Sequence, residues 1–541
     1  MANRLAALDW IVVAAYFGLT FGVAIWATVL ERSSRGTSTD YFLAGRDAGW
    51  FLVGGSLFAS NIGSEHLVGL AGTGAASGVA VAHFELLASL VLLVLGWLFV
   101  PFYLASGVFT MPEFLERRYS TGARWYLAVI SIIAYVLTKI SVTIAAGGIV
   151  FEALMGINFW TGAMVVVAIT GVYTIFGGLR AVLYTDLLQM FVLIGGAIAV
   201  TLVGLSALGG WGAMMQAVGP EFMDMWKPMS DPNFPWTGIL FGAPILGVWY
   251  WCTDQFIVQR VLAAKDQRHA RRGTIFAGYL KLLPLFIFVI PGVVAAALAR
   301  QGRLTLAAPD QALPTLVATL LPVGLRGLVV AGLLAALMSS LSSVFNSTST
   351  LVTIDVYKKM RAVASERELV LVGQATTAVL VGFGLAWIPL MKLISGQLYQ
   401  YLQSVQAYIS PPIAAVFLLG VLWRRVNATG AMAALLAGFV LGMGRLVAEI
   451  GKQGLSGALR AYADINFLHF AILLFVICSV ILVVVSLMTA PPAIEKVTGL
   501  TFAVRTRVVE DEPSRRRRRS DTLLSVGVAA SVLAIWWYFS G

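Results

Sequence analysis

Long apolar segments separated by short polar loops run along almost the whole chain. Most are close to the roughly 20 residues that an α-helix needs to cross a bilayer. The pattern therefore predicts an all-α polytopic membrane protein with about fourteen transmembrane helices. The predicted helices cover about 8–30, 49–71, 80–107, 124–154, 158–177, 183–207, 236–261, 273–299, 313–350, 370–391, 397–423, 428–449, 466–488 and 521–539. An even number of crossings places both termini on the same side of the membrane.

One predicted membrane segment is unusually polar. Phe58–Gly78 reads FASNIGSEHLVGLAGTGAASG, with a Ser-Asn pair, a Ser-Glu-His run and recurrent glycines. Hydrocarbon offers no hydrogen-bond partner to loosened backbone or to polar side chains. Such a segment must be buried in protein or line a water-filled cavity. We therefore expect a broken helix on a transport pathway.

A second broken segment, GAPILGVWYWCTDQ, has Gly242, Pro244 and Gly247 within an aromatic helix. Five spans in each of two blocks give the blocks opposite orientations, as in inverted-repeat transporters with a site at mid-membrane. The predicted organisation is a first extra helix with a cytoplasmic loop (1–48), a first five-helix repeat (49–207), a second, inverted repeat (236–423) and C-terminal extra helices with an Arg-rich cytoplasmic loop (424–541).

Composition and charge agree with this class. The 541 residues are 59% hydrophobic and only 12% charged, and the mean hydropathy is +0.87. The net charge of +11 would suggest nucleic acid in a soluble protein, but here basic residues, Arg260 and the run Arg515–Arg519 included, fall in predicted loops. The positive-inside rule places these loops in the cytoplasm. Both termini are then on the non-cytoplasmic side of a plasma membrane, that of a cell or the bacterial inner membrane.

Ionisable and amide side chains inside the spans are candidates for a solute site, because each is costly in a membrane and needs a partner. The candidates are Asn61, Ser64, Glu65, His66, Glu85, Tyr250, Trp251, Lys281 and Gln403. Glu85 and Lys281 could equally form an ion pair that only ties helices together. Lys139 is interpreted as a structural partner or a snorkelling side chain.

The segment ALMSSLSS places Ser339 and Ser340 on one helix face with Ala336. Hydroxyls and carbonyls are oxygen ligands of the kind that bind sodium in transporters. The spacing alone favours an alternative to sodium binding, in which the hydroxyls of both serines donate to carbonyls of the preceding helical turn.

Seven collinear runs resemble the sodium/solute symporter family, in particular its sodium/glucose cotransporter branch. They cover roughly residues 38–490 and read SLFASNIGSEHLVGLAGTGAASG, GWLFVPFYLASGVFTMPEFLERR, TIFGGLRAVLYTDLLQ, WYWCTDQFIVQR, GYLKLLP, LMSSLSSVFNSTSTL and SGQLYQYLQSVQAYISPPIAAVFLLG. The resemblance implies a leucine-transporter-type five-plus-five inverted repeat with extra flanking helices. It also implies import of a small solute coupled to a sodium gradient.

The resemblance implies roles for individual residues. Sodium ligands would come from Ala59, Ile62, Ala336, Ser339 and Ser340, and a second sodium would use Asp186 and Ser342, although Asp186 could equally anchor a helix start. Sugar contacts would come from Asn61, His66, Glu85, Lys281 and Gln403, with Trp251 nearby and Tyr250 covering the cytoplasmic side. Leu70, Phe84 and Tyr399 would form the outer gate, or else pack in the core.

Gly247 and Gln400 depart from the pattern of the sugar-transporting relatives, which leaves the individual sugar open. The expected function is sodium-coupled symport of a glucose- or galactose-like monosaccharide by alternating access, with sodium as the co-transported ion and no obligatory protein partner. The alternatives are a symporter of inositol or another small organic solute, and a sugar-binding membrane sensor. An enzyme is not expected, because no nucleophile–base constellation or phosphate-binding loop is present.

Overall fold

Backbone groups inside hydrocarbon must find partners within the protein, and the apolar segments do so by forming helices. The computed structural model describes residues 5–32, 42–63, 65–391, 398–502 and 512–541. Over these residues the only β-type pairings are two isolated bridges, Ala48 with Ala264 and Lys227 with Pro235. The protein is therefore a helical membrane bundle, as predicted.

All fourteen predicted segments contain helix. The α-helices of the first half are α1 (Ala7–Arg32), α3 (Trp50–Asn61), α4 (Ala71–Ser77), α5 (His83–Val94), α6 (Val100–Ser106), α7 (Met111–Arg118), α8 (Thr121–Tyr135), α9 (Ser141–Val150), α10 (Phe159–Leu208), α11 (Trp211–Val218), α12 (Pro220–Met223), α13 (Ala243–Gly247), α14 (Gln255–Leu262) and α15 (Gln267–Leu280). Those of the second half are α16 (Ile290–Arg300), α17 (Ala312–Leu320), α18 (Leu325–Thr350), α19 (Lys358–Met360), α20 (Glu366–Met391), α21 (Leu398–Leu422), α22 (Ala428–Ile450), α23 (Gly457–Asp464), α24 (Phe467–Met488) and α25 (Glu512–Tyr538).

Many of these helices are joined by π-helical turns, which hold one extra residue per turn and recur at functional sites. They are η2 (Glu65–Leu70), η4 (Leu95–Phe99), η5 (Val136–Ile140), η6 (Phe151–Met155), η7 (Gly238–Gly242), η8 (Val248–Thr253), η9 (Leu285–Val289) and η11 (Leu351–Tyr357). Short 3₁₀ turns are η1 (Ala44–Arg46), η3 (Gly78–Ala82), η10 (Pro309–Gln311), η12 (Lys452–Gly454) and η13 (Ile494–Lys496).

Eleven described helices are long and apolar enough to cross a membrane. Two of the three remaining predicted spans are broken helices, since α3 is short and Gly238–Thr253 is a shorter apolar helix. The third predicted span, 158–177, is the first part of α10. Helix α10 runs without interruption through two predicted spans. Its 50 residues would extend about 75 Å if straight, more than twice the roughly 30 Å hydrocarbon core, so it holds enough chain for two crossings.

The predicted helix over 313–350 is wrong in one respect, because the structure divides it into α17 and α18. The break follows from two residues. Pro322 has no backbone N–H to donate, and Gly324 adopts a φ of 88°, a left-handed conformation that glycine accommodates without steric cost.

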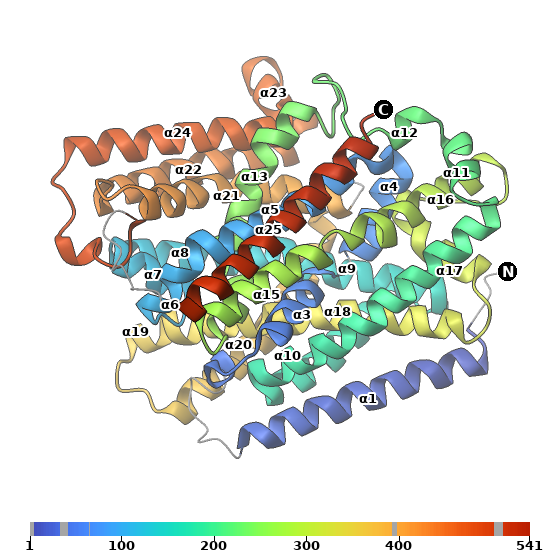
Figure 1. The fold of residues 1–541 in the computed structure, drawn as a ribbon, viewed down its shortest axis with the longest axis horizontal. Helices are drawn as coiled ribbons and strands as arrows, with labels where there is room; N and C mark the ends of the chain where they lie inside the picture. The colour runs from blue at the N-terminus through green and yellow to red at the C-terminus, as the bar shows by residue number, and fades with distance from the viewer. Residues whose placement is uncertain (1–4, 33–41, 64, 392–397, 503–511) are drawn as a thin grey trace.

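The first and last helices lie at the outside of the bundle (Figure 1). Helix α1 packs against α10 and α18, and α25 crosses beside α15 and α5. Helices α21, α22 and α24 pack against one another, and α21 and α24 also contact the second broken helix. The beginning of α1 lies at the right of the view and the end of α25 at its top, whereas α7 and α19 lie toward the left.

Close helix packing in the α21–α22–α24 group depends on a small residue. A Cβ on Gly442 of α22 would lie 1.9 Å from the Tyr408 carbonyl oxygen of α21, whereas one on Gly444 would meet no atom within 4 Å. Small residues let membrane helices approach closely. Gly442 therefore fixes the distance between these two helices.

Candidate functional site

The first broken helix ends as the sequence predicts. Helix α3 stops at Asn61, and the Gly63 N–H donates to the Asn61 carbonyl at 2.9 Å instead of to Ala59, four residues back. The His66 N–H donates to the Gly63 carbonyl at 3.0 Å and not to Ile62. The carbonyls of Ala59 and Ile62 are thus released from the usual helical donors at the break.

The second broken helix places two aromatic side chains in the protein interior. Chain direction changes at Asp254, whose carboxylate accepts from the Phe256 N–H at 3.1 Å and caps α14. Tyr250 and Trp251 precede this cap on η8 and are buried, at 6% and 4% exposure. The two breaks meet directly, because Asn61 Nδ2 donates to Tyr250 Oη at 2.9 Å.

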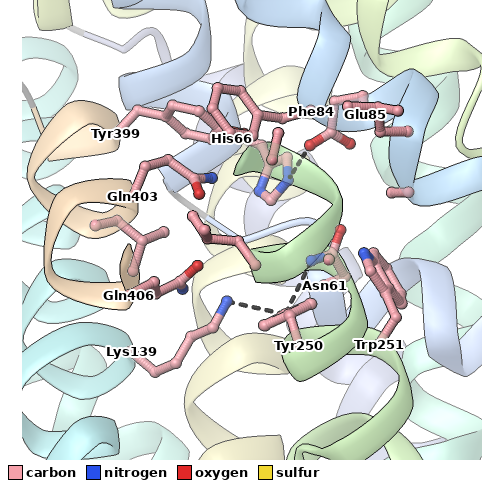
Figure 2. A pocket seen from close by; sticks show the side chains of 16 residues that line it. Asn61, His66, Phe84, Glu85, Lys139, Tyr250, Trp251, Tyr399, Gln403 and Gln406 are labelled. Atoms are coloured by element: carbon pink, nitrogen blue, oxygen red, sulfur yellow. Dashed lines mark hydrogen bonds and ion pairs between the residues drawn. The ribbon is translucent and has the colours of Figure 1, made fainter. Parts of the chain in front are cut away.

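A polar cavity of about 50 Å³ lies between the two breaks (Figure 2). Its lining comes from both broken helices, from α5, η5 and α21, and consists of Asn61, His66, Phe84, Glu85, Leu87, Ala88, Lys139, Ala243, Leu246, Gly247, Tyr250, Trp251, Tyr399, Leu402, Gln403 and Gln406. The volume admits several water molecules, each of which needs roughly 10–15 Å³ on this kind of measure. Six of the seven predicted sugar-binding residues line this cavity.

Lys281, the seventh, is not among the lining residues. Its ammonium group donates to Glu85 Oε2, while Glu85 Oε1 lies 3.1 Å from His66 Nε2. All three side chains are at most 4% exposed. Lys281 thus balances the charge of Glu85 without lining the cavity itself, and Glu85 is the member of the pair that lines it.

Lys139 also reaches the cavity, which its interpretation as a structural or snorkelling side chain did not anticipate. Its Nζ lies 2.9 Å from Tyr250 Oη and 3.1 Å from Glu65 Oε1. It also lies 4.5 Å from the centroid of the Tyr250 ring. Lys139 therefore connects η5 to both broken helices at the level of the Tyr250 side chain.

Two of the predicted gate residues, Phe84 and Tyr399, line the cavity on its other side, whereas Leu70 does not line it. Tyr399 packs edge-on against Phe84, with ring centroids 5.9 Å apart, and against His66 at 6.1 Å. Leu70 is fully buried and Tyr399 is 2% exposed. With Tyr250 on the opposite side (Figure 2), the aromatic side chains enclose the cavity from two directions.

Two polar atoms of the cavity have no hydrogen-bond partner among the described residues. In the described part of the chain, Asn61 Oδ1 and His66 Nδ1 are buried and have no hydrogen bond. Buried polar atoms in native proteins are nearly always paired. Both residues line the cavity, and a hydroxylated ligand there would satisfy them.

A second polar cluster lies around Asp186. Asp186 Oδ2 accepts from Ser56 at 2.6 Å and from Ser60 at 2.8 Å, and Oδ1 accepts from Ser339. Arg260 Nη2 lies 3.7 Å from Oδ2. The cluster joins α3, α10, α14 and α18 at one point in the interior.

This cluster corrects the assignment of Arg260 to a cytoplasmic loop, since the side chain is fully buried on α14. Ser56, Ser60 and Ser343, which the sequence did not single out, also belong to this cluster. Ser343 accepts from Arg260, whereas the predicted Ser342 donates to the Ser339 carbonyl of its own helix at 3.0 Å. The i, i+4 spacing of Ser56 and Ser60 on one helix face was a usable signal.

Ser340 lies at the first break, as predicted, and its hydroxyl donates to the Ser60 carbonyl at 3.2 Å. Ala336, Ser339 and Ser340 are all buried on α18. The loosened backbone around Ala59 and Ile62 therefore faces α18 across this contact. Ser64 lies outside the described residues.

Comparison with known proteins identifies the fold. The chain resembles the structure of a substrate-bound, outward-open Na⁺-coupled sialic acid symporter, with a TM-score of 0.74, 20% identity and coverage of 90% of this chain and 99% of that one. It also resembles a closed nucleobase-cation-symport-1 family transporter, with a TM-score of 0.52, 15% identity and coverage of 81% and 94%. The fold is therefore of the leucine-transporter type, as predicted.

Sequence relatives are closer. The chain is 41% identical to sodium/glucose cotransporter 1 of Oryctolagus cuniculus, with coverage of 90% of this chain and 79% of the relative. It is 40% identical to cotransporter 4 of Mus musculus, covering 93% and 78%, and 41% identical to cotransporter 2 of Rattus norvegicus, covering 92% and 81%. The model of the sodium:solute symporter family matches residues 41–438. This chain is therefore a membrane transporter that belongs to the sodium:solute symporter family.

Proposed function

We propose that this protein imports a monosaccharide of the glucose or galactose type together with sodium. The similarity of about 40% to sodium/glucose cotransporters over most of the chain supports sodium-coupled sugar symport. The observation that carries the proposal for the site is the cavity between the two broken helices, with its unpaired Asn61 Oδ1 and His66 Nδ1. A sugar needs such convergent hydrogen-bonding groups beside aromatic walls.

In the proposed site, Asn61, His66, Glu85, Gln403 and the newly found Gln406 bind sugar hydroxyls. Trp251 supplies an apolar wall, and Tyr250 covers the cytoplasmic side. Lys281 acts through Glu85.

The proposed sodium ion is bound between α3 and α18 by the carbonyls of Ala59, Ile62 and Ala336 and the hydroxyls of Ser339 and Ser340. The released carbonyls at the break and the Ser340–Ser60 contact support this arrangement. Sodium then holds the broken helix against α18 and completes the sugar site. By reciprocity, bound sugar must raise the sodium affinity to the same extent.

A second sodium near Asp186 remains a proposal, with Ser343 a better-placed hydroxyl than Ser342. Arg260 already balances Asp186, so a second cation there would have to displace or share this partner. The four-part division at residues 1–48, 49–207, 236–423 and 424–541 is likewise proposed, as are a plasma-membrane location and termini outside the cytoplasm.

Uptake of radiolabelled galactose and glucose into proteoliposomes of the purified protein tests the function. We expect accumulation driven by an inward sodium gradient, abolished by Ser340→Ala. The matched control is Thr348→Val on the same helix, whose hydroxyl donates only within α18, to Val344. Equal accumulation with potassium would refute sodium coupling, binding without accumulation would indicate a sensor, and preference for inositol would indicate the other symporter. Activity of the purified protein alone also tests independence from a protein partner.

A further inference from the structure

Glu65 is a buried carboxylate to which the sugar and sodium sites described above give no role. It begins η2, directly after the break in the first helix, and is 1% exposed. Its Oε1 accepts from Lys139 at 3.1 Å. An ionisable side chain inside a membrane span is costly and marks a functional position by default.

The second carboxylate oxygen is not paired. Glu65 Oε2 is buried and has no hydrogen-bond partner in the described residues. Its position is fixed by Gly63, where an added Cβ would lie 2.2 Å from Glu65 Oε2 and 2.4 Å from Ser340 Oγ. The carboxylate oxygen and the hydroxyl oxygen therefore flank the same small space at the break, and only glycine leaves that space open.

The surroundings of this oxygen favour a cation. On one side is Ser340, and the break itself releases the Ile62 carbonyl from its helical donor. The other nearby carboxylate, Asp186, already has hydrogen bonds on both oxygens. Carboxylate oxygens are strong ligands of hard cations, and the number of charged ligands tunes the affinity of such sites.

We propose that Glu65 Oε2 is an additional ligand of the sodium ion, which gives an otherwise neutral set of carbonyls and hydroxyls one negative charge. This inference rests on the proposed sodium site between α3 and α18. Glu65 Oε1 stays with Lys139, whose Nζ also contacts Tyr250 Oη at 2.9 Å. The ion is then linked through Glu65 and Lys139 to the side chain that covers the sugar.

The competing explanation is that Glu65 only balances the charge of Lys139. The two explanations predict different behaviour when the pair is removed together. A counter-ion role is lost with its partner, so Glu65→Gln with Lys139→Gln would bind sodium like the wild type. A ligand role is lost with Glu65 regardless of Lys139.

The test is equilibrium binding of ²²Na⁺ to the purified protein without sugar, for Glu65→Gln, Lys139→Gln and the double variant. We expect Glu65→Gln and the double variant to raise the sodium Kd by about tenfold or more, given the strong dependence on ligand charge, and Lys139→Gln alone not to raise it. Glu449→Gln is the control, since it neutralises a carboxylate paired with Arg445 on α22, away from the site.

The outcomes distinguish a failure of the Glu65 proposal from a failure of the proposed sodium site between α3 and α18. A double variant with wild-type sodium affinity would overturn the role of Glu65 while leaving the sodium site intact. A wild-type protein that binds no sodium would overturn the site itself. Glu65→Gln alone leaves the charge of Lys139 without its partner and could prevent folding, which size-exclusion chromatography would show. In that case the sodium affinity of the double variant, which has neither charge, decides whether Glu65 is a sodium ligand.

Discussion

Glu85 has two proposed roles, which are to bind the sugar and to hold neighbouring helices together through Lys281. Variants that neutralise its charge can distinguish these roles. Glu85→Gln keeps the shape of the side chain but removes the charge that faces Lys281 and His66. Lys281 is 1% exposed, so its charge would be left in the interior beside the Trp251 ring, 5.2 Å away. Breaking a buried pair in this way costs about 3–5 kcal/mol. We therefore expect a markedly lower thermal stability in detergent.

Glu85→Gln should also lower the affinity for the sugar. A hydrogen bond from a sugar hydroxyl to a carboxylate contributes about 1.5–3 kcal/mol, which corresponds to about 10- to 150-fold in affinity. Glu85→Gln should therefore raise the sugar concentration for half-maximal uptake in proteoliposomes by at least tenfold.

The double variant Glu85→Gln with Lys281→Gln distinguishes the two losses. It removes both charges, so thermal stability should recover toward the wild type. Half-maximal uptake should still require the higher sugar concentration, because the carboxylate is absent. Recovery of wild-type sugar affinity in the double variant would show that Glu85 only ties α5 to α15 and its neighbours, and our interpretation of the cavity would be wrong.

Three further predictions concern the scaffold. Asp9 of α1 accepts from the Gly324 and Gly327 N–H groups at 2.7 and 2.9 Å and from Arg326 at 2.8 Å. Asp9→Asn should therefore destabilise the docking of α1 by about 3–5 kcal/mol and lower the unfolding temperature. An unchanged unfolding temperature would contradict this. Gly442→Ala should lower the unfolding temperature and Gly444→Ala should not, because only the first collides with the Tyr408 carbonyl; equal effects would disprove the close approach. On α7, burial raises the pKa of Glu116, but hydrogen bonds from Lys359 and Arg124 outweigh it and lower the pKa to about 2 from the model-peptide value of 4.5. Glu116 should therefore stabilise the protein above pH 4.5, and the stability gap to Glu116→Gln should narrow as the pH falls toward 2; a gap independent of pH would exclude this contribution.

The sequence predicted the broken helices well because the signal is local. Polar residues and glycines such as Asn61 and Gly63 cannot face lipid, so their presence in an apolar segment indicates a break wherever the neighbours lie. Gly242, Pro244 and Gly247, before Tyr250, indicate the second break in the same local way. Asn61 and Tyr250 then line the cavity.

Pairing between distant side chains was harder to predict. Arg260 follows an apolar stretch and precedes a basic loop, so the sequence suggested the membrane edge, whereas the side chain turns inward to Asp186. Lys139 was assigned to structure because nothing local shows that Tyr250 lies beside it. Successive helix positions point about 100° apart, and this explains why Ser343, and not Ser342, reaches Arg260. Such contacts depend on helix rotation, which periodicity in a uniformly buried helix does not define.

The ion pairs in the interior determine how the membrane potential acts on transport. Glu85 pairs with Lys281, Glu65 with Lys139 and Asp186 with Arg260, so these six side chains together carry no net charge. A bound sodium ion therefore adds a whole positive charge to the loaded carrier. Moving that charge through 100 mV releases about 2.3 kcal/mol, enough for about 50-fold accumulation of a neutral sugar. In the proposed cycle with one sodium ion, the voltage would then drive the loaded crossing, and the empty carrier, with these pairs neutral, would return without working against it.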